Sequence, residues 1–339
     1  MEMSTTAIRI GDRSNVAEVR RAARTHAERL EWREGDRGDC EIVATELATN
    51  IVKHASEGAV AVTSWAEGDA GVVLVTAIDR GPGMNVERCL EDGYSTAGSA
   101  GIGLGAVRRL SSAGFDSTED GTVIVAELRH PTGAARRAGI LEVARASPPL
   151  EVGGLVMPME REAVSGDAWA CRRRDGSLAV LVSDGLGHGQ AAHEASMRAI
   201  REFCEAAWRT PREGLETIHR VLRSTRGAAC ALALIEPERA IVRFCGVGNI
   251  SASLVDADET RHLVSQNGIL GAMVPRLTEF EYPWSGTASL VLHSDGINSR
   301  WHPRRWPGLW RRHPALIAAV LYRDCARGND DVVAVVVHP

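Results

Sequence analysis

Four aspartates at the ends of apolar, strand-like runs limit most strongly what this chain can fold into. They are Asp167 in VSGDAWA, Asp184 in VSDGLGHG, Asp295 in VLHSDGINS and Asp330 in GNDDVVAVVV. One Asp-Gly pair usually forms a turn. Four such aspartates instead predict a β-sandwich that gathers several carboxylates at one rim. Because carboxylates are hard oxygen ligands, the rim suits Mg²⁺ or Mn²⁺ rather than Zn²⁺.

A rim of this kind predicts chemistry on phosphate groups. Two divalent ions about 3.5–4 Å apart can activate a bridging water and hold a phosphoryl group. The tandem Asp330-Asp331 leaves the register of the last ligand open between the two residues. His188 either touches substrate or only shapes the turn after Asp184, and we favour the turn.

The first third of the chain predicts a nucleotide site of another kind. Lys53 is the only lysine and is followed by His54, so neither a P-loop nor a kinase with a strand lysine is possible. The helical stretch CEIVATELATNIVKHA places Glu46 and Asn50 four residues apart on one face. A carboxylate and an amide in that arrangement suit a magnesium–phosphate site, and a solvated helix face is the alternative.

Glycines follow at two later points. The buried strand in VVLVTAIDRGPGM ends at Asp79, which could accept a hydrogen bond from an adenine amino group while Gly81 and Gly83 admit the ring. A glycine-rich loop then leads into a helix whose N-terminal amides can bind an anion. The residues involved are Gly101, Gly103 and Gly105, with Thr122 at the start of a further strand.

The order of these patterns predicts two α+β domains. We expect a domain at 1–131, a linker at 132–150 and a domain at 151–339, with EGDRGD (34–39) separating the first two helices. The first domain has helices on one face of a mostly antiparallel sheet, and the second is a β-sandwich flanked by helices. The expected strands are 6–10, 59–66, 71–78, 121–129, 151–158, 167–173, 177–183, 229–235, 240–246, 250–255, 288–293 and 332–337, and the expected helices are 15–32, 39–55, 102–113, 189–208, 211–225 and 311–325.

Composition excludes several other classes of protein. The formal net charge of −5 creates no field that would attract nucleic acid. No apolar run reaches the length of a membrane span, and the N-terminus does not read as a signal peptide. The seven cysteines are scattered and form no CxxC pair, which predicts free thiols in a reducing cytoplasm.

Taken in order, the nucleotide motifs resemble the N, G1, G2 and terminal boxes of the GHKL (HATPase) ATPase fold. ELATNIVKHA and EDGYSTAGSAGIGLGAVRRLSS are similar to RsbT-type serine/threonine switch kinases over roughly residues 5–130. The resemblance implies that ATP lies between the N-box helix and the glycine loop. Asn50 would then hold Mg²⁺, Asp79 would read adenine, and Glu46 would deprotonate the substrate hydroxyl.

The aspartate motifs resemble PPM-type metal-dependent serine/threonine phosphatases of the SpoIIE-like branch. SGDAWA, SDGLGHGQAA, GVGNI, NGILG and SDGI are similar to RsbX-type phosphatases over about residues 150–339. The resemblance implies a site for two Mn²⁺ or Mg²⁺ ions. Asp184 would bridge both ions, the Gly185 carbonyl would bind one, Asp167 would serve one, and Asp295 and Asp330 the other. Ala170 stands where many relatives carry a further aspartate, which lowers the charge of the site.

Together the resemblances imply a bifunctional bacterial stress-signalling protein. One half would phosphorylate and the other dephosphorylate STAS-domain partners of a stressosome-like module. Two alternatives remain open. The first domain could bind ATP only to gate the phosphatase, or it could sequester a sigma factor or its regulator as anti-sigma kinases do.

One segment stands outside these motifs. RWHPRRWPGLWRRHP (300–314) interleaves arginines with tryptophans. Such interleaving can bind single-stranded nucleic acid. We favour a cover packed down by the tryptophans, and docking of a substrate is the third possibility.

Overall fold

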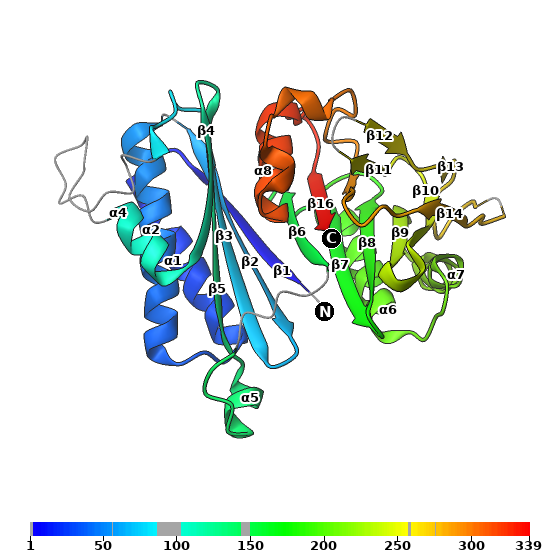
Figure 1. Cartoon of the computed structure of the whole chain (residues 1–339), viewed down its shortest axis with the longest axis horizontal. Helices are drawn as coiled ribbons and strands as arrows, with labels where there is room; N and C mark the ends of the chain where they lie inside the picture. The colour runs from blue at the N-terminus through cyan, green and yellow to red at the C-terminus, as the bar shows by residue number, and fades with distance from the viewer. Residues whose placement is uncertain (1–2, 56, 87–102, 144–149, 257–258, 275) are drawn as a thin grey trace. The chain divides into compact units, whose positions relative to one another are not determined.

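The computed structural model of the chain describes residues 3–55, 57–86, 103–143, 150–256, 259–274 and 276–339. The chain divides into two compact units, residues 3–146 and residues 147–339 (Figure 1). Each unit is described by itself below. Within the described residues, no helix combines the length and apolar character needed to cross a membrane.

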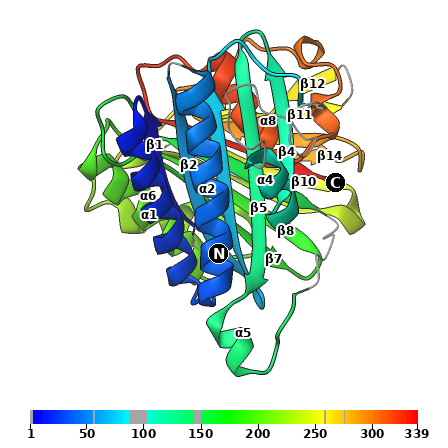
Figure 2. The same ribbon diagram turned by 90° about the vertical axis from the view of Figure 1, so that its left-hand side faces the viewer.

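The N-terminal unit is one antiparallel sheet in the order β1-β2-β3-β5-β4, with helices on one face (Figure 2). This arrangement confirms the α+β sandwich expected from the sequence. Its elements are β1 (Ser4–Ile10), α1 (Arg13–Arg29), α2 (Glu34–His54), β2 (Gly58–Glu67), β3 (Ala70–Asp79), α4 (Gly103–Leu110), β4 (Ser112–Thr118), β5 (Gly121–Pro131) and α5 (Gly133–Arg137).

Helix α2 forms the centre of this unit. Its buried residues Cys40, Val43, Leu47 and Ile51 recur every three or four positions and so face one side. They belong to one core cluster with the inward residues of β2 and β3, such as Val62 and Val75. Burial of these side chains fixes α2 against the sheet and with it the positions of Glu46 and Asn50 on the helix.

Two expectations for this unit are wrong. EGDRGD is not a break, because α2 already begins at Glu34. Asp36, in its first turn, is buried and accepts hydrogen bonds from the Arg33 and Arg136 side chains, and acidic side chains favour a helix start. The helix expected at 102–113 ends at Leu110, because the following residues pair with β5 as strand β4.

The C-terminal unit is a sandwich of two sheets, as expected. One sheet has the order β13-β10-β9-β8-β7, with β14 also pairing with β10, and the other has the order β12-β11-β15-β16-β6. Its elements are β6 (Glu151–Met157), β7 (Asp167–Arg174), β8 (Ser177–Gly185), α6 (Gln190–Glu205), α7 (Pro211–Leu222), β9 (Ala228–Glu236), β10 (Ile241–Val247), β11 (Ser251–Asp256), β12 (Glu259–His262), β13 (Ser265–Gln266), β14 (Phe280–Pro283), β15 (Ser289–His293), α8 (Pro314–Cys325) and β16 (Val332–His338).

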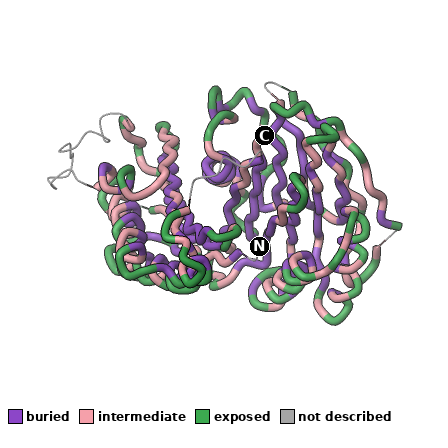
Figure 3. Tube along the Cα trace, turned by 60° about the horizontal axis from the view of Figure 1, so that its bottom comes forward, coloured by how far each residue is buried: buried purple, intermediate pink, exposed green. Residues whose placement is uncertain are grey.

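Helices cover the outer faces of the sandwich. Helices α6 and α7 pack on the sheet that contains β8, and α8 packs on β6 and β16. The central strands are therefore buried along most of their length, whereas exposure concentrates in the turns (Figure 3). The short strands β12, β13 and β14 were not expected, because each has only two to four residues and carries little apolar pattern.

A buried histidine links α1 to the sheet. His26 is 2% exposed, and its ring nitrogens lie 2.7 Å from Ser64 Oγ and 3.0 Å from Thr6 Oγ1. Burial, together with the nearby Arg29 charge, lowers the pKa of His26 from 6.5 to about 4. The folded state therefore holds this ring neutral where the unfolded chain would protonate it.

We predict that the wild-type protein loses about 3 kcal/mol of folding free energy through His26 as the pH falls from 7 to 4. The sign follows because a lowered pKa in the folded state leaves the unfolded state binding more protons in this window. Urea unfolding followed by circular dichroism at several pH values measures the loss. The variant His26→Gln should show a flatter pH dependence, and identical slopes in the two proteins would contradict the prediction.

Candidate functional site

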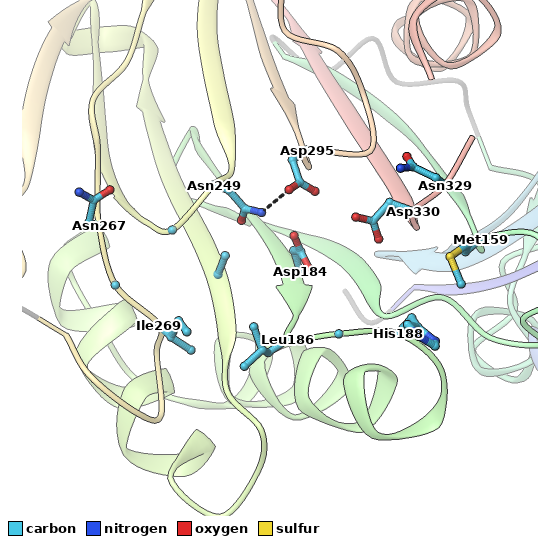
Figure 4. Close-up of a pocket in the computed structure, with 14 residues that line it drawn as sticks. Met159, Asp184, Leu186, His188, Asn249, Asn267, Ile269, Asp295, Asn329 and Asp330 are labelled. Carbon is cyan, nitrogen blue, oxygen red and sulfur yellow. Dashed lines mark hydrogen bonds between the residues drawn. The ribbon is translucent and has the colours of Figure 1, made fainter. Parts of the chain in front are cut away.

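Three carboxylates from both sheets of the C-terminal unit face one pocket of about 590 Å³. Asp184 lies at the end of β8, Asp295 follows β15, and Asp330 precedes β16. Figure 4 shows the three side chains directed toward one another from these strand ends. The β-sandwich thus brings together residues that are separated by 146 positions of chain.

Asp167 lies next to this pocket, at the start of β7. It stands directly opposite Asp184 in the β7–β8 register, is 4% exposed, and its Oδ2 atom has no hydrogen-bond partner. Like charges at directly opposed positions repel each other. Burial and the Asp184 charge accordingly raise the pKa of Asp167 well above its usual value.

Burial and neighbouring carboxylates also raise the pKa of Asp184. Burial, followed by the charges of Asp295 and Asp330, raises the pKa of Asp184 to about 7. Burial also raises the pKa of Asp330. A hydrogen bond from the Asp331 amide lowers this pKa, and the charges of neighbouring carboxylates raise it. The pocket therefore carries more negative charge than its own side chains neutralise.

The donor set fits divalent cations that prefer oxygen. In the described part of the chain, no three His, Cys, Asp or Glu side chains are already spaced as the ligands of one ion. The orphaned Asp167 Oδ2 atom and the raised pKa of Asp184 nevertheless indicate a place where positive charge would be stabilised. Gly185, whose carbonyl was expected to serve as a ligand, ends β8 beside Asp184, and its amide donates to the Gly166 carbonyl at 3.0 Å.

The side chains of the tandem aspartates Asp330 and Asp331 lie in different environments. Asp330 is exposed and lines the pocket. Asp331 is 3% exposed, and its two oxygens accept hydrogen bonds of 2.7 Å from the amides of Met159 and Gly166. Asp331 thereby ties the loop before β7, which leads into Asp167, to the start of β16. Its bonding capacity is directed at backbone rather than at the pocket.

Residues that sequence reasoning missed complete the pocket wall. Asn249, just after β10, donates its Nδ2 to Asp295 Oδ2 at 2.7 Å, and Asn267 and Asn329 add further amides. His188 also lines the pocket, where its Nδ1 lies 2.7 Å from Glu162 Oε1. The asparagine in GVGNI directly follows a strand and a glycine, and that placement was the available signal.

In the N-terminal unit, the residues expected at the adenine end gather at the end of β3. The Asp79 Oδ1 atom accepts hydrogen bonds from the amides of Gly81 at 2.8 Å and Thr122 at 3.2 Å. The Thr122 hydroxyl lies 3.0 Å from Ser117 Oγ. A side chain at Gly83, which has φ +76°, would clash with the Thr118 carbonyl. Backbone amides thus fix the orientation of the Asp79 carboxylate at the end of β3.

The other expected nucleotide residues lie along α2 and α4. A Cβ atom at Gly103 would stand 2.5 Å from Glu46 Oε2, so the start of α4 closely approaches the Glu46 carboxylate. The Asn50 Nδ2 atom is buried without a hydrogen-bond partner. Gly105 is buried within α4, and Gly101 lies outside the described residues. A buried amide without a partner in the structure fits a polar ligand at this place on α2.

Comparisons with known proteins divide the chain in the same way. Residues 174–338 match the family model Stage II sporulation protein E (SpoIIE), and residues 11–128 match the model Histidine kinase-like ATPase domain. Serine/threonine-protein kinase RsbT of Bacillus subtilis (strain 168) is 31% identical over 104 residues, which are 30% of this chain and 78% of that protein.

Two solved structures extend the comparison. A structure from work on the bacterial stressosome, described as a modular system adapted to control secondary messenger signaling, is 28% identical with a TM-score of 0.53, covering 56% of this chain and 99% of that one. The PP2C phosphatase domain of SpoIIE from Bacillus subtilis, with a fragment of its regulatory domain, is 17% identical with a TM-score of 0.48 and covers 81% of each chain.

We predict that alanine at the two tandem aspartates changes the free energy of unfolding by very different amounts. Asp331→Ala leaves the buried Gly166 amide and the partly buried Met159 amide without acceptors and should lower the free energy of unfolding of the C-terminal unit by about 3 kcal/mol. Asp330→Ala removes an exposed charge and should change it by less than about 0.5 kcal/mol. Denaturant unfolding followed by tryptophan fluorescence measures both, and equal losses in the two variants would refute the assignment.

Proposed function

The chain is an RsbT-like histidine kinase-like ATPase domain fused to a SpoIIE/PP2C-type phosphatase domain, and on that premise we propose that it is a bifunctional switch of bacterial stress signalling. The N-terminal unit phosphorylates a serine or threonine on STAS-domain proteins, and the C-terminal unit removes phosphate from such partners. The observation that carries the phosphatase half is the convergence of Asp184, Asp295 and Asp330 on one pocket.

In the phosphatase half, two Mn²⁺ or Mg²⁺ ions would be held by carboxylates and one backbone carbonyl. The ligands would be Asp167, Asp184, the Gly185 carbonyl, Asp295 and Asp330. Such ions, when bound, supply Lewis acidity that activates water and neutralises phosphoryl charge. The raised pKa of Asp184 supports this assignment, because cations would relieve the repulsion that causes it.

Neighbouring residues position these ligands. Asn249 holds the Asp295 carboxylate by a 2.7 Å hydrogen bond and so restricts its rotation. Asp331 holds the backbone that leads into Asp167. Leu186 and Ile269 give the pocket an apolar wall, which excludes water beside a bound phosphoseryl chain. His188, tethered by Glu162, continues the pocket wall beyond Leu186.

In the kinase half, ATP with Mg²⁺ would bind between α2 and the start of α4. Asn50 would hold Mg²⁺, Asp79 would accept from the adenine amino group, and Glu46 would take the proton of the substrate hydroxyl. The glycines at 81, 83, 101, 103 and 105 and the Thr122 hydroxyl would complete the pocket. The similarity to RsbT, a serine/threonine-protein kinase, supports this proposal.

The proposed partners follow from the relatives. RsbT and the stressosome structure support STAS-domain proteins of a stressosome-like module, or a sigma-factor regulator, as partners. The cysteines of the described residues are free thiols, which suits a cytoplasmic location. Because simultaneous activity on one site would only hydrolyse ATP, we propose that the two units act on different sites or are regulated in opposite directions.

We predict that Asp184→Asn lowers hydrolysis of para-nitrophenyl phosphate at least about a thousandfold in the presence of Mn²⁺, because one carboxylate would serve both ions. Mn²⁺ should also raise the thermal midpoint of the wild type more than that of the variant. Asp175→Asn is the matched control, since Asp175 lies at the exposed far end of the same β7–β8 hairpin. Wild-type rates in Asp184→Asn would disprove the metal assignment.

We predict that Glu46→Ala lowers phosphotransfer from ATP to STAS-domain proteins about a hundredfold or more, with ATP affinity nearly unchanged, because only the base is lost. Mass spectrometry of STAS-domain proteins incubated with the chain and ATP measures the transfer. Glu18→Ala, on the exposed face of α1, is the control. If the wild type binds ATP yet never transfers phosphate, gating by ATP replaces the kinase proposal. Capture of a sigma factor without ATP turnover would instead favour an anti-sigma module.

A further inference from the structure

A strongly basic segment lies between two of the pocket aspartates. Residues 300–314, RWHPRRWPGLWRRHP, contain five arginines and no acidic residue, although the whole chain has a formal net charge of −5. The arginines are all exposed: Arg300, Arg304, Arg305, Arg311 and Arg312. We call these five side chains and the backbone that carries them the arginine surface.

The tryptophans of residues 300–314 anchor the backbone that carries the arginine surface. Trp306 is 7% exposed and donates its Nε1 to Asp324 Oδ2 at 2.6 Å. Asp324 is in turn paired with Arg323, which is 1% exposed, at 2.7 Å. This chain of bonds anchors the segment to the C-terminal end of α8. The buried ion pair leaves neither charge unpaired, so Trp306 has a rigid acceptor.

The remaining tryptophans pack on one another. The rings of Trp301 and Trp310 are stacked with centroids 5.6 Å apart, and Trp310 donates its Nε1 to the Pro303 carbonyl at 3.1 Å. Trp306 contacts both rings, at 6.4 and 6.5 Å. The tryptophan rings therefore mainly contact one another, and the exposed side chains of the segment are mainly the positively charged arginines.

Three of the five guanidinium groups have no carboxylate of the chain beside them. Across the described ranges, no carboxylate lies within ion-pair distance of the Arg300, Arg311 or Arg312 side chains. Arg305 lies over the Trp306 ring, 5.3 Å from its centroid. Because like charges repel, an external anion would stabilise the exposed charges of Arg300, Arg311 and Arg312.

The arginine surface is connected at both ends to the pocket wall. The Trp301 Nε1 atom lies 3.4 Å from Nε2 of His293, two residues before Asp295. Two backbone hydrogen bonds, from Asn298 to the Cys325 carbonyl and from Arg327 to the Gly296 carbonyl, close the segment into a loop. The loop leaves the pocket at Asp295 and returns to it at Asn329 and Asp330.

We propose that the arginine surface is a docking site for an acidic stretch of the phosphoprotein substrate, so that the site recognises Asp- and Glu-rich sequence around or beside the phosphorylated residue. The proposal rests on the phosphatase activity proposed above and adds the class of substrate. An acidic peptide matches this surface in charge, and guanidinium groups bind carboxylates in a forked geometry. Single-stranded nucleic acid would need free aromatic faces for its bases, and these rings are occupied by each other.

The test uses the full chain and the triple variant Arg300→Glu/Arg311→Glu/Arg312→Glu. A fluorescein-labelled peptide rich in Asp and Glu, without phosphate, probes docking by fluorescence anisotropy and needs no turnover. The variant should bind this peptide about tenfold or more weakly, and added salt should weaken wild-type binding. For a phosphoserine peptide with the same acidic flanks, kcat/KM should fall by a similar factor.

Two controls separate docking from folding and from catalysis. Hydrolysis of para-nitrophenyl phosphate should stay within about twofold in the variant, because this small substrate cannot reach the arginine surface and the charges are exposed. The variant Arg201→Glu/Arg220→Glu/Arg261→Glu makes the same change of charge at exposed positions on α6, α7 and β12 and should bind the acidic peptide like the wild type.

The possible results are distinct. Loss of acidic-peptide binding only in the first variant supports docking, even if no phosphate is ever hydrolysed, in which case the phosphatase proposal alone fails. Equal wild-type binding of the acidic peptide and a matched Asn/Gln peptide would overturn docking. So would an unchanged dissociation constant in the variant, or tighter binding of a single-stranded DNA oligonucleotide that the variant abolishes.

Discussion

Repulsion among closely placed carboxylates is the constraint on which the C-terminal unit depends. Asp167 and Asp184 face each other across two neighbouring strands, and Asp295 and Asp330 add their charges from the second sheet. No isolated hairpin would hold such groups together, since opposed like charges destabilise a pair of strands. The apolar interior of the sandwich and its covering helices provide the opposing free energy, so the stability of the core maintains the charged rim.

In both units, backbone amides donate hydrogen bonds to an aspartate at the end of a buried strand. An aspartate that follows or precedes a buried strand must find hydrogen-bond donors, because an unpaired buried carboxylate is costly. Asp331 accepts from the amides of Met159 and Gly166, and Asp79 accepts from those of Gly81 and Thr122. In the first case both oxygens are used and the residue fixes a loop. In the second both amides bind the Oδ1 atom and orient the carboxylate at the end of β3.

Much of the fold could be predicted because its elements are long and strongly patterned. Strands such as β3 and β16 are continuous apolar runs, and α2 places its buried residues at helical spacing. The start of α2 was missed because Gly35 and Gly38 suggest a loop, whereas the ion pairs of Asp36 with Arg33 and Arg136 favour the helix. Strand β4 was missed because its identity depends on pairing with β5, which no local pattern of SAGFDST reveals.

The sequence by itself determined the chemical inventory of this protein: aspartates at strand ends, Glu46 and Asn50 on one helix face, and glycines where the backbone comes close to other groups. Tertiary structure alone decided which of these residues share a pocket. Asp330 and Asp331 are the same residue type at consecutive positions. Asp330 nevertheless lines the pocket, whereas Asp331 binds the backbone of a loop that is distant in sequence. Tertiary packing also decided how residues 300–314 are arranged, because their tryptophans pack on one another while their arginines are exposed. Direction and contact depend on long-range packing, which local sequence does not encode.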